Sequence, residues 1–321
     1  MRSAWVECDS AKLQLDLPPS ERYRALTQRQ ILHGRELLEG VSSQMPPGIL
    51  RLAETIDQRT GGKFRPEAEA IAERHGCSWQ AILIANVSYD LLIMQLGCST
   101  AMLATPEGPV AARNMDWAPE ALLARASVLL QFCFEDELLF QSAGWPGSIG
   151  VVTGMSSQGY AIFLHAVAAP EGSDLSGYPM LLFLRRVLAE SDGFNDAVKR
   201  VASEPLVTGG LISVVGTKNE QRVVVERAPR RHALRWAEGS EPLMATNHYR
   251  MLDIPSQDLL GACPRFERLK KLAGKRKEIS DAALLEVLAD KEVRQEITAQ
   301  HVIMRPAQNS MRLFVPAHLV E

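Results

Sequence analysis

The sequence predicts an α+β protein of four layers, in which two β-sheets pack face to face between helices. Two observations lead to this class. The residues before Gly97 have mainly helical apolar spacing, and the pattern after Gly97 changes to short apolar strands separated by turns. Later helices interrupt the strands, so the order is helices, strands, two helices, strands, helix, strands. Because an apolar sheet face must be covered by another layer, this order fits two antiparallel sheets flanked by helices.

The segment before Gly97 predicts four helices. An apolar stripe runs at intervals of three and four through the first of them. Residues 46–48, Pro-Pro-Gly, end that stripe. Gly76 can serve as a C-cap of the third helix and Ser78 as an N-cap of the fourth. The predicted helices span Glu21–Glu39, Ile49–Arg59, Glu67–His75 and Trp79–Leu96.

The segment after Gly97 predicts mostly strands. A turn of sequence Pro-Glu-Gly at residues 106–108 joins the first two strands into a hairpin. The predicted strands are Thr100–Ala104, Val110–Asp116, Ser127–Phe134, Leu138–Ser142, Gly150–Thr153, Tyr160–Ala166, Leu211–Thr217, Arg222–Arg227, His232–Glu238, Leu243–Ala245, His301–Met304 and Met311–Val315. The predicted helices are Pro179–Glu190, Asn195–Ser203, a helix that opens at Arg265 and runs toward Lys271, and Ser280–Asp290.

Composition restricts the class of protein. The chain has 321 residues, of which 46% are hydrophobic and 23% charged, so it can bury a sizeable core. No Pro/Ser-rich linker marks the change of pattern near Gly97, which favours a single domain. A net charge of −3 gives no reason to expect a nucleic-acid partner. The densest basic run, from Lys270 to Lys277, continues a helical pattern and is interpreted as a solvated face.

Cysteine usage and the N-terminal residues bear on cofactors and location. Five cysteines at irregular spacing argue against a disulfide framework and allow one functional thiol. Without CxxC or HxxxH spacing or a glycine-rich phosphate loop, we expect no metal and no cofactor. The chain has neither a signal-peptide pattern nor an apolar run of membrane-spanning length, so we expect a cytoplasmic protein without a membrane span. The cysteines are Cys8, Cys77, Cys98, Cys133 and Cys263.

One cysteine and a nearby polar cluster carry the chemistry. Cys98 follows Gly97, and an apolar strand farther along ends in Arg113, Asn114 and Asp116. Charged side chains are seldom buried without a partner, so this cluster calls for a functional explanation. Arg113 and Asp116 are three positions apart and therefore point to opposite faces of a regular strand. The alternative is a buried structural cysteine beside a solvated strand end.

These residues resemble a known family. The stretches that carry the resemblance are Asn86–Leu91, Gly97–Thr100, Ala112–Trp117, Thr246–His248 and Pro264–Leu269. They resemble the cysteine-type N-terminal nucleophile (Ntn) hydrolases. The chain is most similar to the isopenicillin N acyltransferase and acid ceramidase / N-acylethanolamine amidase groups, and more distantly to choloylglycine hydrolases. One position departs from the family, because many relatives have Thr directly after the cysteine, whereas here Ser99 precedes Thr100.

The resemblance implies an αββα sandwich that cuts its own chain between Gly97 and Cys98. Residues 1–97 would form a helical pro-segment and residues 98–321 the nucleophile-bearing chain, both within one globular unit. Cleavage places a free α-amine on the residue that carries the thiol. An α-amine with an ordinary pKa of about 7.7–8.0 suits a general acid and base. Gly97 adds no side chain beside the carbonyl that the thiol attacks.

The resemblance also assigns roles around Cys98. Asp116 would accept hydrogen bonds from the α-amino group, and Arg113 would stabilise the thiolate, as a neighbouring positive charge does. Asn247 would supply the amide that stabilises the oxyanion, although an Asx-turn is the alternative for an asparagine after a strand.

Three further residues complete the expected site. Arg265 is the expected site arginine, with Arg268 as the fallback and local pairing with Glu267 as the alternative for both. His165 stands where relatives carry a second oxyanion donor, although a histidine on a strand is commonly a satisfied core residue. Trp117 is expected to line the acyl pocket.

The predicted function is an autocatalytically processed amidase or acyltransferase that cleaves a non-peptide carboxamide through a Cys98 thioester. Of the two reactions, we expect hydrolysis rather than acyl transfer, because water is always available as the acceptor. The expected partner is a small-molecule amide with an apolar acyl group. The sequence does not decide whether the protein forms a homo-oligomer. Two alternatives remain. The chain could be an uncleaved, non-catalytic binding scaffold of the same fold, or a Cys–His peptidase that depends on a histidine such as His248.

Overall fold

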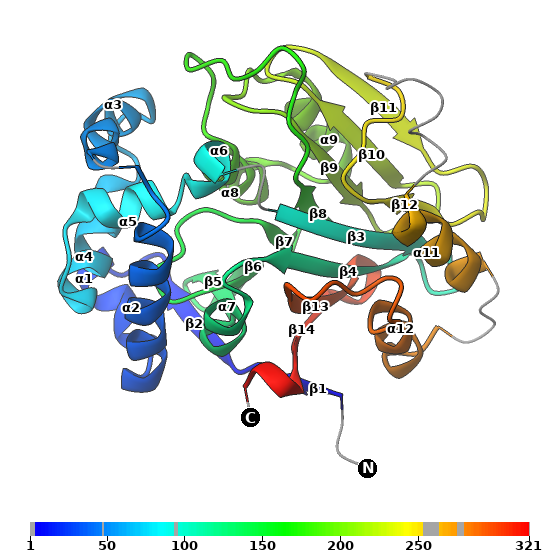
Figure 1. Cartoon of the computed structure of the whole chain (residues 1–321), viewed down its shortest axis with the longest axis horizontal. Coiled ribbons are helices and arrows are strands. Elements are labelled where there is room, and N and C mark those ends of the chain that lie inside the picture. Colours follow the sequence, from blue (N-terminus) through cyan, green and yellow to red (C-terminus); the bar gives the residue numbers. More distant parts are fainter. Residues whose placement is uncertain (1–3, 47, 93–95, 253–262, 275–278, 321) are drawn as a thin grey trace.

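The computed structural model describes residues 4–46, 48–92, 96–252, 263–274 and 279–320. These residues form two sheets that face each other (Figure 1). The six-stranded sheet has the order β1 (Trp5–Glu7), β14 (Ser310–Pro316), β13 (Thr298–Arg305), β4 (Val110–Trp117), β3 (Leu96–Leu103) and β12 (Leu243–Ala245). The eight-stranded sheet has the order β11 (His232–Trp236), β10 (Arg222–Arg227), β9 (Gly210–Val215), β8 (Tyr160–His165), β7 (Thr153–Ser156), β6 (Glu137–Gly144), β5 (Val128–Phe134) and β2 (Ser10–Gln14).

Helices cover the outer face of each sheet. Figure 1 shows the blue and cyan N-terminal helices gathered at one side of the molecule and α11 and α12 at the other. The α-helices are α1 (Pro19–Arg22), α2 (Gln28–Ser42), α3 (Leu52–Arg59), α4 (Arg65–His75), α5 (Trp79–Ala85), α6 (Ser88–Leu92), α7 (Glu120–Ala126), α8 (Met180–Glu190), α9 (Phe194–Ser203), α11 (Pro264–Gly274) and α12 (Asp281–Leu288). Short 3₁₀ turns are η1 (Tyr23–Ala25), η2 (Ile49–Arg51), η4 (Pro306–Gln308) and η5 (Ala317–Leu319).

The apolar core follows this layering. One cluster, which includes Met102, Phe163 and Val302, fills the space between the two sheets. Helices α11 and α12 pack a second cluster against the outer face of the six-stranded sheet. The N-terminal helices with α8 and α9 bury the third and largest against the eight-stranded sheet. The expected α+β sandwich of two sheets between helical layers is therefore confirmed. None of the helices in the described ranges is long and apolar enough to cross a membrane.

The structure corrects several predicted elements. The fourth N-terminal helix is not continuous to Leu96: α5 ends at Ala85, α6 follows, and Leu96 already belongs to β3, with residues 93–95 outside the described ones. Asn86 explains the break. Its side-chain oxygen accepts the N–H groups of Ile149 and Gly150 at 2.6 and 2.9 Å, and its amide nitrogen donates to Gly147 O at 3.0 Å. These long-range bonds fix the chain in a bend that helical periodicity cannot reveal.

Other corrections concern short elements. The predicted helix Glu21–Glu39 is divided into α1, η1 and α2, because Thr27 and Gln30 form a capping box that starts α2 at Gln28. The strand predicted at Gly150–Thr153 instead spans Thr153–Ser156. Strands β1 and β2 and helix α7 were not predicted from the sequence. The sheets are also not wholly antiparallel, since β2 pairs with β5 in parallel. Of the predicted basic face, Lys270 and Lys271 are exposed on α11, and residues 275–278 lie outside the described ones.

His301 on β13 links the fold to a pH-dependent stability. Its ring is buried, and Nδ1 lies 2.6 Å from the side-chain oxygen of Asn114. Burial and the charges of Arg294 and His318 lower the pKa of His301 from 6.5 to about 4. Between these values the unfolded chain holds a proton that the folded protein excludes, so the free energy of unfolding falls as the pH drops through this range.

We expect His301→Gln to weaken this acid destabilisation. Glutamine retains a donor for Asn114 but does not titrate. The measurement is the free energy of unfolding in urea, for wild type and variant, at several pH values between about 4 and 7. Parallel curves for the two proteins would show that His301 does not contribute.

Candidate active site

Cys98 lies on β3, buried between the two sheets, and is paired with Met115 on β4. The guanidinium of Arg113 donates from Nη2 to Cys98 Sγ at 3.1 Å and to Leu164 O at 2.6 Å. Its Nη1 donates to Val152 O at 3.1 Å and to the Thr153 hydroxyl. Arg113 is fully buried and makes no ion pair with a carboxylate of the described residues. A buried cation without an anionic partner is costly, and a thiolate at Sγ would supply that partner.

Strand pairing places Arg113 and Asp116 on opposite faces. Thr100 pairs with Arg113, and Gly97 pairs with Asp116. Since directly paired residues point to the same side of a sheet, Cys98 and Arg113 share the face toward the eight-stranded sheet. Asp116 points to the other face, toward α11. The spacing argument from the sequence therefore agrees with the structure.

Asp116 lies beside Gly97 rather than against the Cys98 nitrogen. Its carboxylate is fully buried and accepts the Thr298 hydroxyl and the Gln295 amide, both at 2.6 Å. A side chain at position 97 would overlap the Gln295 amide and come within 3.1 Å of the Asp116 carboxylate. A larger residue at position 97 would therefore displace the Gln295 amide from Asp116.

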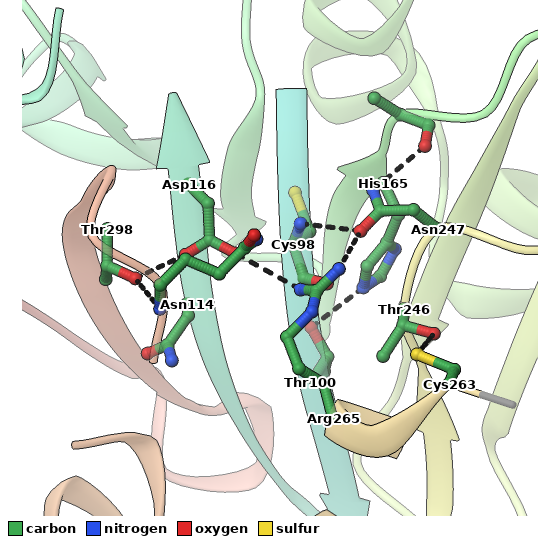
Figure 2. Close-up of polar contacts among 12 residues, drawn as sticks. Cys98, Thr100, Asn114, Asp116, His165, Thr246, Asn247, Cys263, Arg265 and Thr298 are labelled. Atoms are coloured by element: carbon green, nitrogen blue, oxygen red, sulfur yellow. Dashed lines mark hydrogen bonds and ion pairs between the residues drawn. The ribbon is translucent and has the colours of Figure 1, made fainter. Parts of the chain in front are cut away.

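Asn247 follows β12 and makes the contact with the Cys98 nitrogen. Its Oδ1 accepts the Cys98 N–H at 2.9 Å and a guanidinium N–H of Arg265 at 3.0 Å, and its Nδ2 donates to Ala166 O at 2.9 Å (Figure 2). Two donors on one atom and an acceptor on the other fix the orientation of the amide. The amide nitrogen carries two hydrogens, and only one is used in these contacts. The other is free to stabilise a developing negative charge.

Arg265 connects the parts of the site. Figure 2 shows its side chain reaching from the start of α11 to Cys98, Asp116 and Asn247. Nη1 lies 2.9 Å from Cys98 O and 3.3 Å from the Asp116 carboxylate. Arg268 instead pairs with Asp290, at 2.6 and 3.0 Å. Of the two arginines considered from the sequence, the structure brings only Arg265 to Cys98.

His165 on β8 is fully buried, with both ring nitrogens engaged. Nε2 lies 2.9 Å from the Thr100 hydroxyl, and Nδ1 lies 3.3 Å from Leu211 O. Burial, with the charge of Arg113, holds the pKa of His165 well below 6.5, so the ring is neutral. These contacts favour a structural role for His165 over that of an oxyanion donor.

His248, the histidine named for the Cys–His peptidase alternative, does not contact Cys98 in the described residues. His248 is exposed, and its Nδ1 lies 3.5 Å from the Thr246 hydroxyl, which in turn lies 3.6 Å from Cys263 Sγ. Burial raises the pKa of Cys263, but hydrogen bonds from His248, the Phe266 backbone and Thr246 outweigh it and lower this pKa to about 6. His248 is therefore associated with Thr246 and Cys263, and Cys98 is not among its contacts in the part of the chain that the structure describes.

Two cavities meet at Trp117. The smaller, about 250 Å³ including any part open to solvent, is lined by residues that include Cys98, Arg113 and Trp117. The larger, about 620 Å³ including any part open to solvent, lies between α2, α4, α5 and the loop at residues 145–150, and its lining is mainly apolar. Trp117 and Val152 line both cavities. Within the described ranges, no group of three His, Cys, Asp or Glu side chains is placed to hold a metal ion.

The sequence did not identify Gln295 and Thr298, which hold Asp116. Thr298 opens β13, next to β4, and pairs with Asp116 across the sheet. No local motif marks either residue. Their role depends on the pairing of strands whose residues lie 182 positions apart in the chain.

Comparison with known proteins agrees with this geometry. The family model described as acyl-coenzyme A:6-aminopenicillanic acid acyl-transferase matches residues 103–301, more than half of the chain. The chain is 23% identical to an N-acylethanolamine-hydrolyzing acid amidase of Caenorhabditis elegans, over 92% of this chain and 88% of that protein. It is 21% identical to a probable acid ceramidase of the same organism, over 67% of this chain and 62% of that protein.

A solved structure supports the fold. The C. elegans N-acylethanolamine-hydrolyzing acid amidase ortholog superimposes with a TM-score of 0.56 at 19% identity, over 65% of this chain and 93% of that one. At this identity the likeness concerns the fold alone. It confirms the sandwich of two sheets between helical layers that the sequence predicts.

Proposed function

Because the chain belongs to the acyl-coenzyme A:6-aminopenicillanic acid acyl-transferase family, of the Ntn-hydrolase type, we propose that Cys98 is the nucleophile of an amidase that activates itself by cleaving the Gly97–Cys98 bond. The enzyme is a hydrolase of amide bonds, as its homologues are named. The proposal concerns the cleavage, the roles of the residues and the substrate.

One observation carries the assignment of Cys98. Arg113 is a buried guanidinium whose partners are carbonyl and hydroxyl oxygens and the Cys98 sulfur. Neutral oxygens accept hydrogens from its two terminal nitrogens, and its Nε has no hydrogen-bond partner among the described residues, so its charge is left without a counterion. A thiolate on Cys98 would remove this imbalance, and the thiolate is the reactive form of cysteine. A structural cysteine would gain nothing from such a neighbour.

Self-cleavage would begin with attack of Cys98 Sγ on the Gly97 carbonyl. The C–N bond breaks as the C–S bond forms, which moves the acyl group of Gly97 onto sulfur and leaves an amine on Cys98. Water then hydrolyses this thioester, releasing a carboxylate on Gly97 and a free thiol. Hydrogen bonds from Arg265 to the Cys98 carbonyl and from Cys98 N–H to Asn247 hold the reacting residue on both sides.

Turnover would use the same residues. Cys98 Sγ attacks the substrate carbonyl, and the unused N–H of Asn247 stabilises the oxyanion. The α-amine of Cys98 passes the thiol proton to the departing amine, leaving an acyl thioester. Water, deprotonated by that α-amine, hydrolyses the thioester and releases the acid. An amine acceptor in place of water would make the same enzyme an acyltransferase.

The substrate we propose is an N-acyl amine with an apolar acyl group. The larger cavity has a mainly apolar lining, as small-molecule sites do, and shares Trp117 and Val152 with the cavity of Cys98. An acyl chain on Sγ that passes these two residues would enter an apolar space. The names of the relatives, N-acylethanolamine amidase and acid ceramidase, support the same class.

A panel of amides tests the substrate class. The acyl chain is varied from acetyl to long saturated chains while the amine is kept as ethanolamine, and the released amine is measured. We expect kcat/KM to rise with chain length, and Val152→Trp, which fills the junction of the two cavities, to reduce this preference. A preference for acetyl amides in the wild type would contradict the acyl assignment.

A further inference from the structure

The segment that carries Asn247 is held from both ends by an ion pair, of which the carboxylate is fully buried and the guanidinium half-buried. Glu226 on β10 is fully buried, and its carboxylate lies 3.5 Å from Arg235 on β11. Downstream of Asn247, the same carboxylate accepts three consecutive backbone N–H groups: Arg250 at 2.9 Å, Met251 at 2.8 Å and Leu252 at 3.0 Å.

Upstream of Asn247, the other member of the pair makes the contact. Arg235 Nη1 donates to Met244 O on β12 at 2.9 Å. Next to Glu226 on β10, Arg227 O accepts the Tyr249 hydroxyl at 2.5 Å. The chain from Met244 to Leu252 is thus tied to the eight-stranded sheet on both sides of Asn247, while β12 itself belongs to the six-stranded sheet.

We propose that Glu226, with Arg235, is a positioning residue that sets the place of Asn247 relative to Cys98. This inference rests on the proposed role of Asn247. Glu226 does not touch the reacting atoms, since its hydrogen-bond and ion-pair partners among the described residues are backbone N–H groups and Arg235. A carboxylate that accepts three N–H groups fixes a turn more firmly than neutral groups can, because charged hydrogen bonds are shorter and stronger. Displacement of a catalytic group by about 1 Å can reduce the rate by about a hundredfold.

Glu226→Gln tests the proposal. The amide can keep one acceptor oxygen for the three N–H groups, but it removes the negative charge and turns an NH₂ group toward Arg250 N–H and Arg235, so the turn is held less firmly. We expect kcat for amide hydrolysis to fall about tenfold to a hundredfold with KM changed less than about threefold. The matched control is Glu67→Gln. Glu67 is also a buried carboxylate with arginine partners, Arg22 and Arg185, but it lies on α4. We expect that control to lose stability and to keep kcat.

A double-mutant cycle separates positioning from general loss of structure. In the Asn247→Ala background, Glu226→Gln should change kcat by less than about twofold, because the group that it positions is gone. Equal effects of Glu226→Gln in both backgrounds would overturn the proposal. If Asn247→Ala itself leaves kcat unchanged, the proposed role of Asn247 fails instead, and the two failures are distinct.

A second variant covers the case in which Glu226→Gln does not fold. Tyr249→Phe removes only the hydroxyl that bonds Arg227 O. In the Tyr249→Phe variant, the fold change in kcat should exceed the fold change in KM. The loss of kcat should also vanish in the Asn247→Ala background. A Tyr249→Phe enzyme with wild-type kcat, together with an uncoupled or unmeasurable Glu226 variant, would overturn the proposal.

Discussion

Replacing Cys98 with alanine is expected to leave the chain uncut and to abolish amide hydrolysis. The substitution removes the sulfur atom that would form the thioester, so no amide hydrolysis should remain above background. Cys98→Ser should differ in degree. A hydroxyl is a much weaker nucleophile at neutral pH, so slow cleavage can persist while turnover collapses. The measurements are the masses of the purified chains and the rate of amine release.

Cys133→Ala is the matched control. Cys133 is also a buried free cysteine, on β5 of the other sheet, and it is absent from the contacts of the site. That variant should be cut and active like the wild type. A Cys98→Ala protein that hydrolyses amides would remove Cys98 from the mechanism, whatever the state of its chain.

The second large effect is expected for Asn247→Ala. Loss of one oxyanion donor reduces kcat by about a hundredfold to a thousandfold in comparable sites. Here alanine also removes the acceptor for the Cys98 nitrogen, so self-cleavage should slow as well. Kinetics of pre-cleaved protein and a time course of cleavage measure the two effects separately.

Two further variants make the Asn247 result specific. Asn247→Asp keeps an oxygen for the Cys98 nitrogen and Arg265 but lacks the N–H donor, so it should impair turnover more than cleavage. Asn219→Ala removes a side chain with a similar pair of bonds, both to the backbone of Thr105 and remote from Cys98. It should leave kcat unchanged. Similar losses in the Asn219 and Asn247 alanine variants would mean that stability, not chemistry, explains the effect.

The layers of the fold could be predicted because they depend on local patterns. Alternating apolar residues and turn signals located most strands of both sheets. The failures share a physical cause: the helix break at Asn86 depends on hydrogen bonds to residues about sixty positions away, which no local period records. Strand β2 carried a readable signal, since Ala11 and Leu13 alternate with polar neighbours, but its pairing with β5 is a long-range choice.

The site could be predicted in part, and mainly through resemblance. Spacing alone placed Arg113 and Asp116 on opposite faces of one strand, and the structure agrees. The approach of Arg265 and Asn247 to Cys98 required the family pattern, because more than a hundred residues separate them from Cys98 in the chain. Gln295, Thr298 and Glu226 could not be found by either route, since each acts by hydrogen bonds that exist only after the sheets have formed.

N-terminal sequencing of the active protein tests the central claim most directly. The account predicts two chains that remain together through the shared core, one of them starting at Cys98 and 224 residues long in the 321-residue protein. It also predicts that activity appears in step with this chain and that Cys98→Ala yields only the uncut one. Full amide hydrolysis by a protein in which no chain begins at Cys98 would contradict the account.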